Sequence, residues 1–192
     1  MINIVRGDLL VFACAISVRL LYFLVDRQEF VLENWEVASH ILSSGTLAWG
    51  EARTTIFEPL YPLFLAVTRG VVGDRPAAVQ LVQIGIASLA PVGLYHLTEA
   101  LTGRRRTALV AGLLLACDPA SVRHAAYGQT AALLGTLLVA FCWAFARSTT
   151  TSRTTAGAAR AGLWLGLAVL TRTMALPLVA LASLAWAMQG RR

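Results

Sequence analysis

The chain has 192 residues, of which 57% are hydrophobic and 14% are charged, and its mean hydropathy is +0.68. A soluble domain has about a quarter of its residues charged, so this composition excludes a water-soluble globular domain and indicates an integral membrane protein. The net charge of +6 does not indicate a nucleic-acid-binding protein, because the basic residues, all of them arginine, are scattered and many lie at the ends of apolar runs.

The first apolar run, residues 8–25, is long enough to cross a bilayer once. No small-residue cleavage site follows it, so we expect a retained anchor. A polar loop over residues 26–75 comes next, and later apolar runs predict further spans at about 76–97, 107–119, 129–146, 161–170 and 174–188. We therefore expect one all-α membrane domain over residues 1–192, with five to six transmembrane helices and an amphipathic helix in the loop.

Arginine placement predicts the orientation of these spans. Alternating spans bring one set of arginines to the same face: Arg6, Arg104, Arg105, Arg106, Arg147, Arg153, Arg160, Arg191 and Arg192. That face should be cytoplasmic. The loop 26–75 has seven acidic residues against four arginines and should lie on the outer face. We expect a multi-pass protein of the plasma (inner) membrane in the cell envelope, with a cytoplasmic N-terminus.

The loop opens with "DRQEFVLENWEVASHILSSG", residues 26–45. Asp26, Glu29, Glu33 and Glu36 are spaced 3, 4 and 3 apart and would share one face of a helix that Gly45 ends. One interpretation is a solvated acidic face. The other is that one carboxylate near the membrane surface acts as a general base and deprotonates an acceptor hydroxyl.

The segment "FEPLYP", residues 57–62, carries two prolines that exclude a continuous helix through it. We expect a kinked return of the chain to the membrane, followed by a short amphipathic helix, "LFLAVTRGVVG". Tyr61 is either an interfacial anchor or, together with Glu58, part of the wall of a cavity beneath the loop.

Arg172 interrupts the last apolar stretch, which therefore predicts two short helices joined at this residue. A guanidinium inside an apolar segment costs roughly 2.5–3.5 kcal/mol unless it reaches water or a partner. At an outer helix break it could hold a phosphate, and the alternative is an arginine that snorkels to the interface. A short loop brings Arg123 and His124 to the same face, where a lone histidine is more often structural than catalytic. Arg19, inside the first span, either snorkels or pairs with a neighbouring helix.

The three cysteines, Cys14, Cys117 and Cys142, lie in or beside apolar runs, without the spacing of metal ligands. We expect buried thiols. No cofactor is expected, and a divalent cation stays open as an alternative.

Four features follow one another in the order of a known family: an acidic helix ending "ILSSG", then "EPLYPLFLA", "LLLACDP" and "GLWLGLAVLTRTMAL". Together they resemble the N-terminal part of a polytopic glycosyltransferase with the GT-C fold. The resemblance is to the bacterial branch of the protein O-mannosyltransferase and lipid A aminoarabinose transferase families. It implies inverting transfer of a hexose or pentose from a polyprenyl-phosphate donor to an acceptor on the outer face.

The resemblance also implies residue roles. The family's base is an aspartate just after the first span, and that position falls at about Glu29 or Phe30 here. Glu29 is therefore our first choice for the base, with Asp26 and Glu33 behind it. Arg172 corresponds to the family's arginine near the lipid phosphate, and Glu58 with Tyr61 to its Pro-Leu-Tyr segment.

Family members generally have more spans than this chain, so a partial or split enzyme completed by a second chain is one expectation. The rival is a non-catalytic membrane protein: a degenerate family member, an assembly factor or a lipid-carrier binding module. A transporter is disfavoured because the sequence has no internal repeat. The expected partners are the polyprenyl-phosphate-linked sugar, membrane lipid and that second chain, and not nucleic acid.

Overall fold

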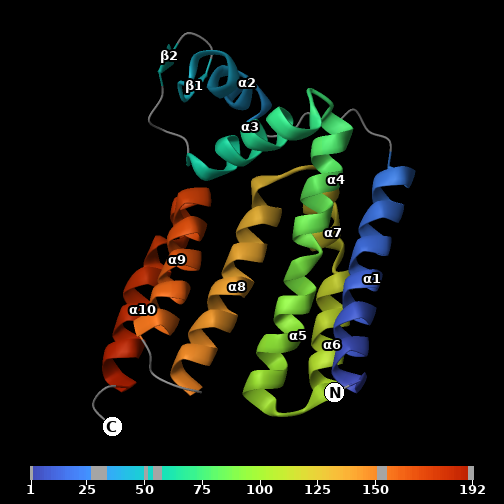
Figure 1. Ribbon diagram of the computed structural model, residues 1–192, viewed down its shortest axis with the longest axis vertical. Coiled ribbons are helices and arrows are strands. Elements are labelled where there is room, and N and C mark those ends of the chain that lie inside the picture. Colours follow the sequence, from blue (N-terminus) through green and yellow to red (C-terminus); the bar gives the residue numbers. More distant parts are fainter. Residues whose placement is uncertain (1, 27–33, 50–51, 54–57, 151–154, 190–192) are drawn as a thin grey trace.

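The computed structural model describes residues 2–26, 34–49, 52–53, 58–150 and 155–189, whose helices form an elongated bundle with a layer of small elements across one end (Figure 1). The predicted all-α membrane class is confirmed. Three helical stretches are long and apolar enough to cross a membrane, Gly7–Val25, Pro76–Thr102 and Thr130–Thr149. The other predicted spans fall on shorter helices, and their crossing of the membrane stays a prediction.

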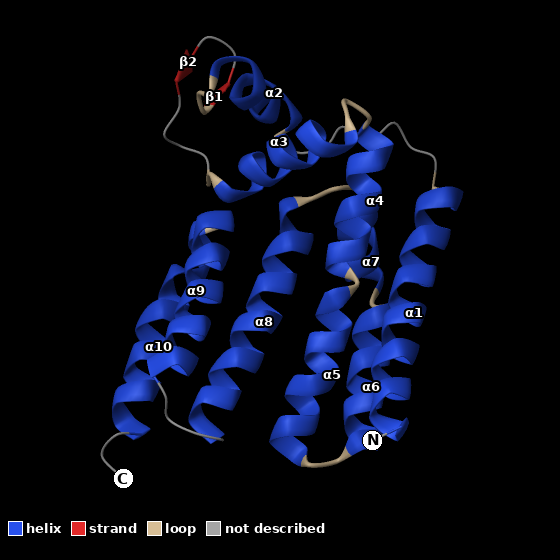
Figure 2. Cartoon of the chain, in the orientation of Figure 1, coloured by secondary structure: helices blue, strands red, loops and turns tan. Residues whose placement is uncertain are grey.

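The bundle consists, in chain order, of α1 (Ile2–Val25), α4 (Pro76–Ala87), α5 (Leu89–Thr102), α6 (Arg105–Cys117), α7 (Pro119–Ala126), α8 (Thr130–Thr150), α9 (Thr155–Thr171), the 3-10 turn η1 (Thr173–Ala175) and α10 (Leu176–Gln189). Across one end lie α2 (Trp35–Ser44), α3 (Leu60–Val72) and a short antiparallel ladder of β1 (Ala48–Trp49) with β2 (Ala52–Arg53) (Figure 2). We call this end the loop end. The opposite end, with residues 104–106, is the arginine end.

Prolines explain two local features of the helices. Pro91 has no N–H to donate to the carbonyl of Ala87, and the helix is interrupted at Ser88, between α4 and α5. The Ser88 hydroxyl donates a hydrogen bond to the carbonyl of Ile84 at 2.7 Å. Pro62 lies in the first turn of α3, where backbone N–H groups have no partner within the helix. The helix therefore begins at Leu60, earlier than the sequence predicted.

The loop expected around Arg123 and His124 is instead helix α7, so that expectation was wrong. Asp118 caps the helix, since its Oδ2 accepts a hydrogen bond from the backbone N–H of Ser121 at 2.6 Å. Pro119 occupies the first helical position, where its fixed φ and missing N–H suit the helix.

Close packing holds α1, α5 and α6 together. A Cβ on Gly112 of α6 would lie 3.1 Å from both Val11 Cγ1 and the carbonyl oxygen of Pro91, so only glycine lets these helices approach so closely. Arg19 of α1 is fully buried at the same interface. Its guanidinium donates to the carbonyls of Ala15 and Ala116 at 3.1 and 3.2 Å, so it pairs with a neighbouring helix rather than snorkelling.

The largest apolar cluster lies beneath the loop end, where α3 covers α4, α8 and α9. Its buried members include Tyr61, Leu65, Val79, Leu134 and Ala168. Because α3 crosses over the ends of these helices, the position of its first turn decides which side chains meet at the loop end (Figure 1).

A buried arginine fastens α2 to α3. Arg69 donates to the carbonyl of Trp35 at 3.1 Å and to Ser39 Oγ at 2.7 Å, and its guanidinium lies 4.0 Å from the centre of the Trp35 ring. Its other terminal nitrogen contacts Asp74 Oδ1 at 2.7 Å. Residues 34–44 are thereby held over the bundle.

The amphipathic helix is shorter than the acidic pattern predicted. It begins at Trp35, because Asn34 adopts a left-handed conformation (φ 62°) that a right-handed helix does not continue through. Asp26 lies beyond the end of α1 and outside α2, so it and Glu36 do not share one helical face. The predicted end is confirmed: Gly45 is left-handed (φ 67°), and its N–H bonds the carbonyl of Ile41.

Candidate functional site

The helical structure is interrupted at Arg172, which lies between α9 and η1. Its backbone is extended (φ −159°, ψ 121°), so α9 ends at Thr171, and its side chain is exposed. The end of α9 lies at the loop end of the bundle (Figure 1). The start of α3 approaches this break. Glu58 Oε1 accepts hydrogen bonds from the backbone N–H and the hydroxyl of Thr173, both at 3.2 Å.

The surroundings of Glu58 keep its carboxylate charged. Partial burial alone would raise its pKa, but hydrogen bonds from backbone N–H groups and the Thr173 hydroxyl, together with the nearby Arg172 guanidinium, lower the pKa below the ordinary glutamate value. The fold thus brings together two of the candidate residues, Glu58 and Arg172, although they are more than a hundred positions apart in the sequence.

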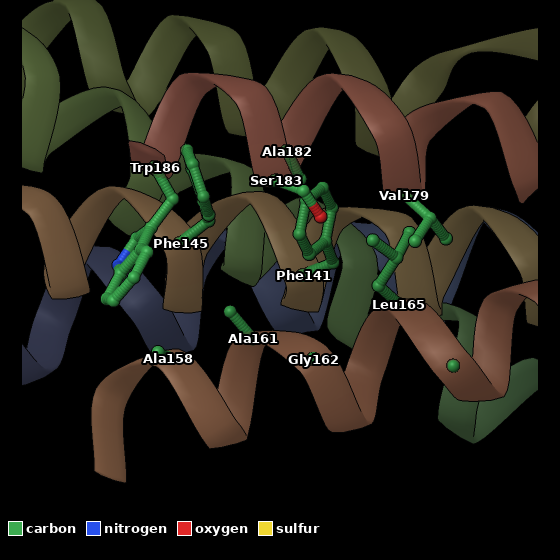
Figure 3. Close-up of a pocket in the computed structure, with 11 residues that line it drawn as sticks. Phe141, Phe145, Ala158, Ala161, Gly162, Leu165, Val179, Ala182, Ser183 and Trp186 are labelled. Carbon is green, nitrogen blue, oxygen red and sulfur yellow. The ribbon is translucent and has the colours of Figure 1, made fainter. Parts of the chain in front are cut away.

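An apolar groove of about 370 Å³ runs along α8, α9 and α10 on the side of the bundle (Figure 3). Its walls are Phe141, Phe145, Ala158, Ala161, Gly162, Leu165, Gly166, Val179, Ala182, Ser183 and Trp186. Gly166, toward the upper end of the groove, precedes Arg172 by six residues, which is about 9 Å along the helix axis. Arg172 therefore follows, at the loop end, the helix that forms one wall of the groove.

A second polar group forms where α1 and α7 end. Tyr127 donates its hydroxyl hydrogen to Asp26 Oδ2 at 2.5 Å, and its hydroxyl lies 3.4 Å from the hydroxyl of Tyr22. Hydrogen bonds to Asp26 and then to Tyr22 raise the pKa of the Tyr127 phenol above its ordinary value. The phenol therefore stays protonated and can keep donating to the carboxylate at neutral pH.

The turn between α7 and α8, residues 127–129, gathers groups from several helices. Tyr61 of α3 donates to the carbonyl of Gly128 and contacts Gln83 Oε1 of α4 at 2.9 Å. Gln83 in turn donates through Nε2 to the carbonyl of Gln129 at 2.8 Å. Gly128 has φ +64°, which a side chain rarely tolerates, and this conformation lets the turn present two neighbouring carbonyls inward.

This turn determines what several predicted residues do. Tyr61 is fully buried, so it neither anchors the chain at an interface nor reaches an open cavity wall. His124 Nδ1 is paired with Gln129 Oε1, and His124 also lines a second cavity of about 260 Å³ with Asp118 and Ser121. The guanidinium of the exposed Arg123 lies 5.3 Å from the centre of the Tyr127 ring. Glu29 and Glu33, candidates for the base, lie outside the described residues.

Three site residues were missing from the sequence-derived candidates: Thr173, Gln83 and Gln129. A signal was available for Gln83, since an amide inside an apolar span has to find a partner and often marks a functional region. No three His, Cys, Asp or Glu side chains gather to hold a metal ion in the part of the chain that the structure describes.

Comparison with known proteins gives one positive result. The family model described as dolichyl-phosphate-mannose-protein mannosyltransferase matches residues 57–192. This range includes Glu58, the turn at 127–129, the apolar groove and Arg172, and it excludes α1 and α2. No curated protein and no solved structure matches the chain.

Proposed function

Because the chain belongs to the dolichyl-phosphate-mannose-protein mannosyltransferase family, whose members are membrane glycosyltransferases of the GT-C type, we propose that it moves a sugar from a polyprenyl-phosphate donor to a hydroxyl acceptor at the loop end. The observation that carries the proposal is that the exposed Arg172 directly follows α9, whose residues form one wall of the apolar groove. A polyprenyl-phosphate sugar has the complementary shape, an apolar chain with an anionic head.

In this arrangement the isoprenoid chain lies in the groove between α8, α9 and α10, and the phosphate meets the Arg172 guanidinium. Arginine suits this role because its planar fork donates two parallel hydrogen bonds to phosphate oxygens. Glu58 lies beside Arg172 and bonds Thr173, so it holds the start of α3 against the helix break. Tyr61, three residues later, supports the same turn from inside the bundle.

The reaction needs a base and a stabilised leaving group. A carboxylate takes the proton of the acceptor hydroxyl, whose oxygen attacks the anomeric carbon from the face opposite the phosphate. The bond between that carbon and the phosphate oxygen breaks, and the phosphate leaves with the electron pair, its charge stabilised by Arg172. Inversion at the anomeric carbon follows from this single displacement.

Three acids remain candidates for the base. Glu29 has the position that the family pattern indicates, with Asp26 and Glu33 as the alternatives. The hydrogen bond from Tyr127 favours a structural or orienting role for Asp26, since it occupies one carboxylate oxygen. We propose to replace each acid by its amide and to measure sugar transfer. Loss of transfer in Glu29→Gln alone supports the first assignment, whereas loss in Asp26→Asn or Glu33→Gln alone moves the base there.

Lipid binding is tested separately from transfer. Purified protein in detergent should bind polyprenyl phosphate, and Arg172→Ala should weaken binding at least tenfold. Arg160→Ala is the matched control, because it removes an exposed arginine of α9 near the opposite end of the helix. Equal binding by the wild type and Arg172→Ala would refute the phosphate site at the helix break.

The second candidate function is a lipid-carrier binding protein without catalysis. The same groove and arginine favour it, because neither requires a base. It predicts binding that depends on Arg172, together with full tolerance of amides at Asp26, Glu29 and Glu33. We place the enzyme first because the family match covers residues 57–192.

We also propose that a second chain could complete the active site. Transfer activity that appears only when this chain is co-expressed with that second chain would reveal it.

A further inference from the structure

Two cysteines from helices far apart in the sequence meet where α1 contacts α6. Cys14 Sγ of α1 lies 3.9 Å from Cys117 Sγ of α6, and 103 residues separate them. The expectation of three buried thiols was wrong: Cys117 and Cys142 are exposed on the surface of the bundle, and Cys14 is half-buried. The pair is therefore accessible from outside through Cys117.

The two thiols lie at the same height in the bundle. Cys14 follows the first residue of α1 by twelve positions, and Cys117 follows the first residue of α6 by twelve, which places each about 18 Å from the arginine end. Both helices begin at that end and run side by side (Figure 1). With the arginine end at one membrane surface, 18 Å falls within a hydrocarbon core about 30 Å thick, so the exposed Cys117 would face lipid.

The helix contacts on either side keep the two sulfurs close. Below the pair, Gly112 allows Val11 to approach α6, as a Cβ there would meet Val11 Cγ1 at 3.1 Å. Above the pair, the buried Arg19 bonds the carbonyls of Ala15 and Ala116, each the sequence neighbour of one cysteine. The sulfurs are thus held between two fixed contacts, and closing the gap to an S–S bond of about 2.05 Å requires a movement of only about 2 Å.

We propose that Cys14 and Cys117 are a redox-modified dithiol that forms an intramolecular disulfide between α1 and α6. Two S–H bonds break and one S–S bond forms, and two electrons and two protons pass to the oxidant. The oxidant has to be an apolar two-electron acceptor that dissolves in the bilayer, and molecular oxygen, which leaves as hydrogen peroxide, is the simplest. The bond would fasten α1 to α6, next to the contacts of Arg19.

The chain supplies its own control, because Cys142 of α8 is also exposed and has no sulfur partner among the described residues. Purified protein in detergent is treated with air and copper–phenanthroline as catalyst, and then denatured. Remaining thiols are counted by the mass added by a maleimide-polyethylene glycol. The wild type and the single variants Cys14→Ser, Cys117→Ser and Cys142→Ser are compared.

After oxidation we expect the wild type to carry one label instead of three, and Cys142→Ser to carry none. Cys14→Ser and Cys117→Ser should keep both of their remaining thiols. A peptide pair joining Cys14 to Cys117, found by mass spectrometry before reduction and lost after it, identifies the bond in the wild type without any substitution. Three labels on the oxidised wild type, or disulfide-linked dimers in place of the intramolecular bond, would overturn the proposal.

Discussion

Arg69 is the residue on which the position of α2 depends most directly. Replacing it by alanine removes the donors to the carbonyl of Trp35 and to Ser39 Oγ, and also the contact with the Trp35 ring. A hydrogen bond from a charged donor contributes about 1.5–3 kcal/mol, and an arginine over an aromatic ring about 0.5–1 kcal/mol. Ser39 still donates to the carbonyl of Trp35 at 3.0 Å, which offsets part of the loss.

We therefore expect Arg69→Ala to destabilise the docking of α2 on α3 by at least about 3 kcal/mol, while the helices of the bundle stay folded. At about 1.4 kcal/mol for each factor of ten, local opening of α2 becomes at least about 100 times more frequent. The assay is amide hydrogen exchange followed by mass spectrometry on peptides that cover residues 37–44.

Asp74→Asn is the control for this prediction. The Asp74 side chain is 73% exposed, so its ion pair with Arg69 should contribute less than about 1 kcal/mol. Unchanged exchange in Arg69→Ala, or an equal increase in Asp74→Asn, would refute the reasoning that buried hydrogen bonds to α2 hold the helix in place.

Three further outcomes follow from the site. Tyr61→Phe removes the hydroxyl that contacts Gln83 and Gly128 and leaves buried acceptors unpaired, so thermal unfolding in detergent should show a loss of about 1–3 kcal/mol; an unchanged midpoint would contradict it. The folded protein lowers the pKa of Glu58, so the carboxylate contributes fully to the free energy of unfolding above its unfolded pKa of about 4.3, and this contribution is lost as the pH falls through the folded pKa. Glu58→Gln should therefore remove this acid dependence of the unfolding midpoint. The same acid dependence in the variant would show that another group is responsible. A Cβ on Gly162 meets open space, so Gly162→Leu should fill the groove without unfolding the protein and weaken polyprenyl-phosphate binding about tenfold or more, whereas Gly70→Leu on α3 should leave binding unchanged.

The sequence predicted features that depend on local chemistry. Gly45 ends α2 because a left-handed C-terminal residue favours glycine, and Arg172 interrupts an apolar run that would otherwise continue. Local signals were also present for α7, since Asp118 followed by Pro119 is typical of a helix start. A loop was expected there because Arg123 and His124 lie between two predicted spans.

Features that depend on tertiary contacts could not be predicted from the sequence. Thr173 and Glu58 are 115 residues apart, and nothing in the spacing of "FEPLYP" indicates that α3 begins beside the break after α9. The burial of Tyr61 depends on the turn at 127–129, because its hydroxyl donates to the carbonyl of Gly128 in that turn. In the same way, Asn34 ended the predicted acidic helix through a backbone conformation that asparagine tolerates but does not require.

The central claim is that this chain transfers a sugar rather than only holding a lipid. The most direct measurement is release of free polyprenyl phosphate from a panel of polyprenyl-phosphate sugars, mannose included, by the purified protein in the presence of a hydroxyl acceptor. We expect release that requires the acceptor and is lost in Arg172→Ala and in one of the amide variants at residues 26, 29 and 33. Tight, Arg172-dependent binding with no release from any donor would contradict it.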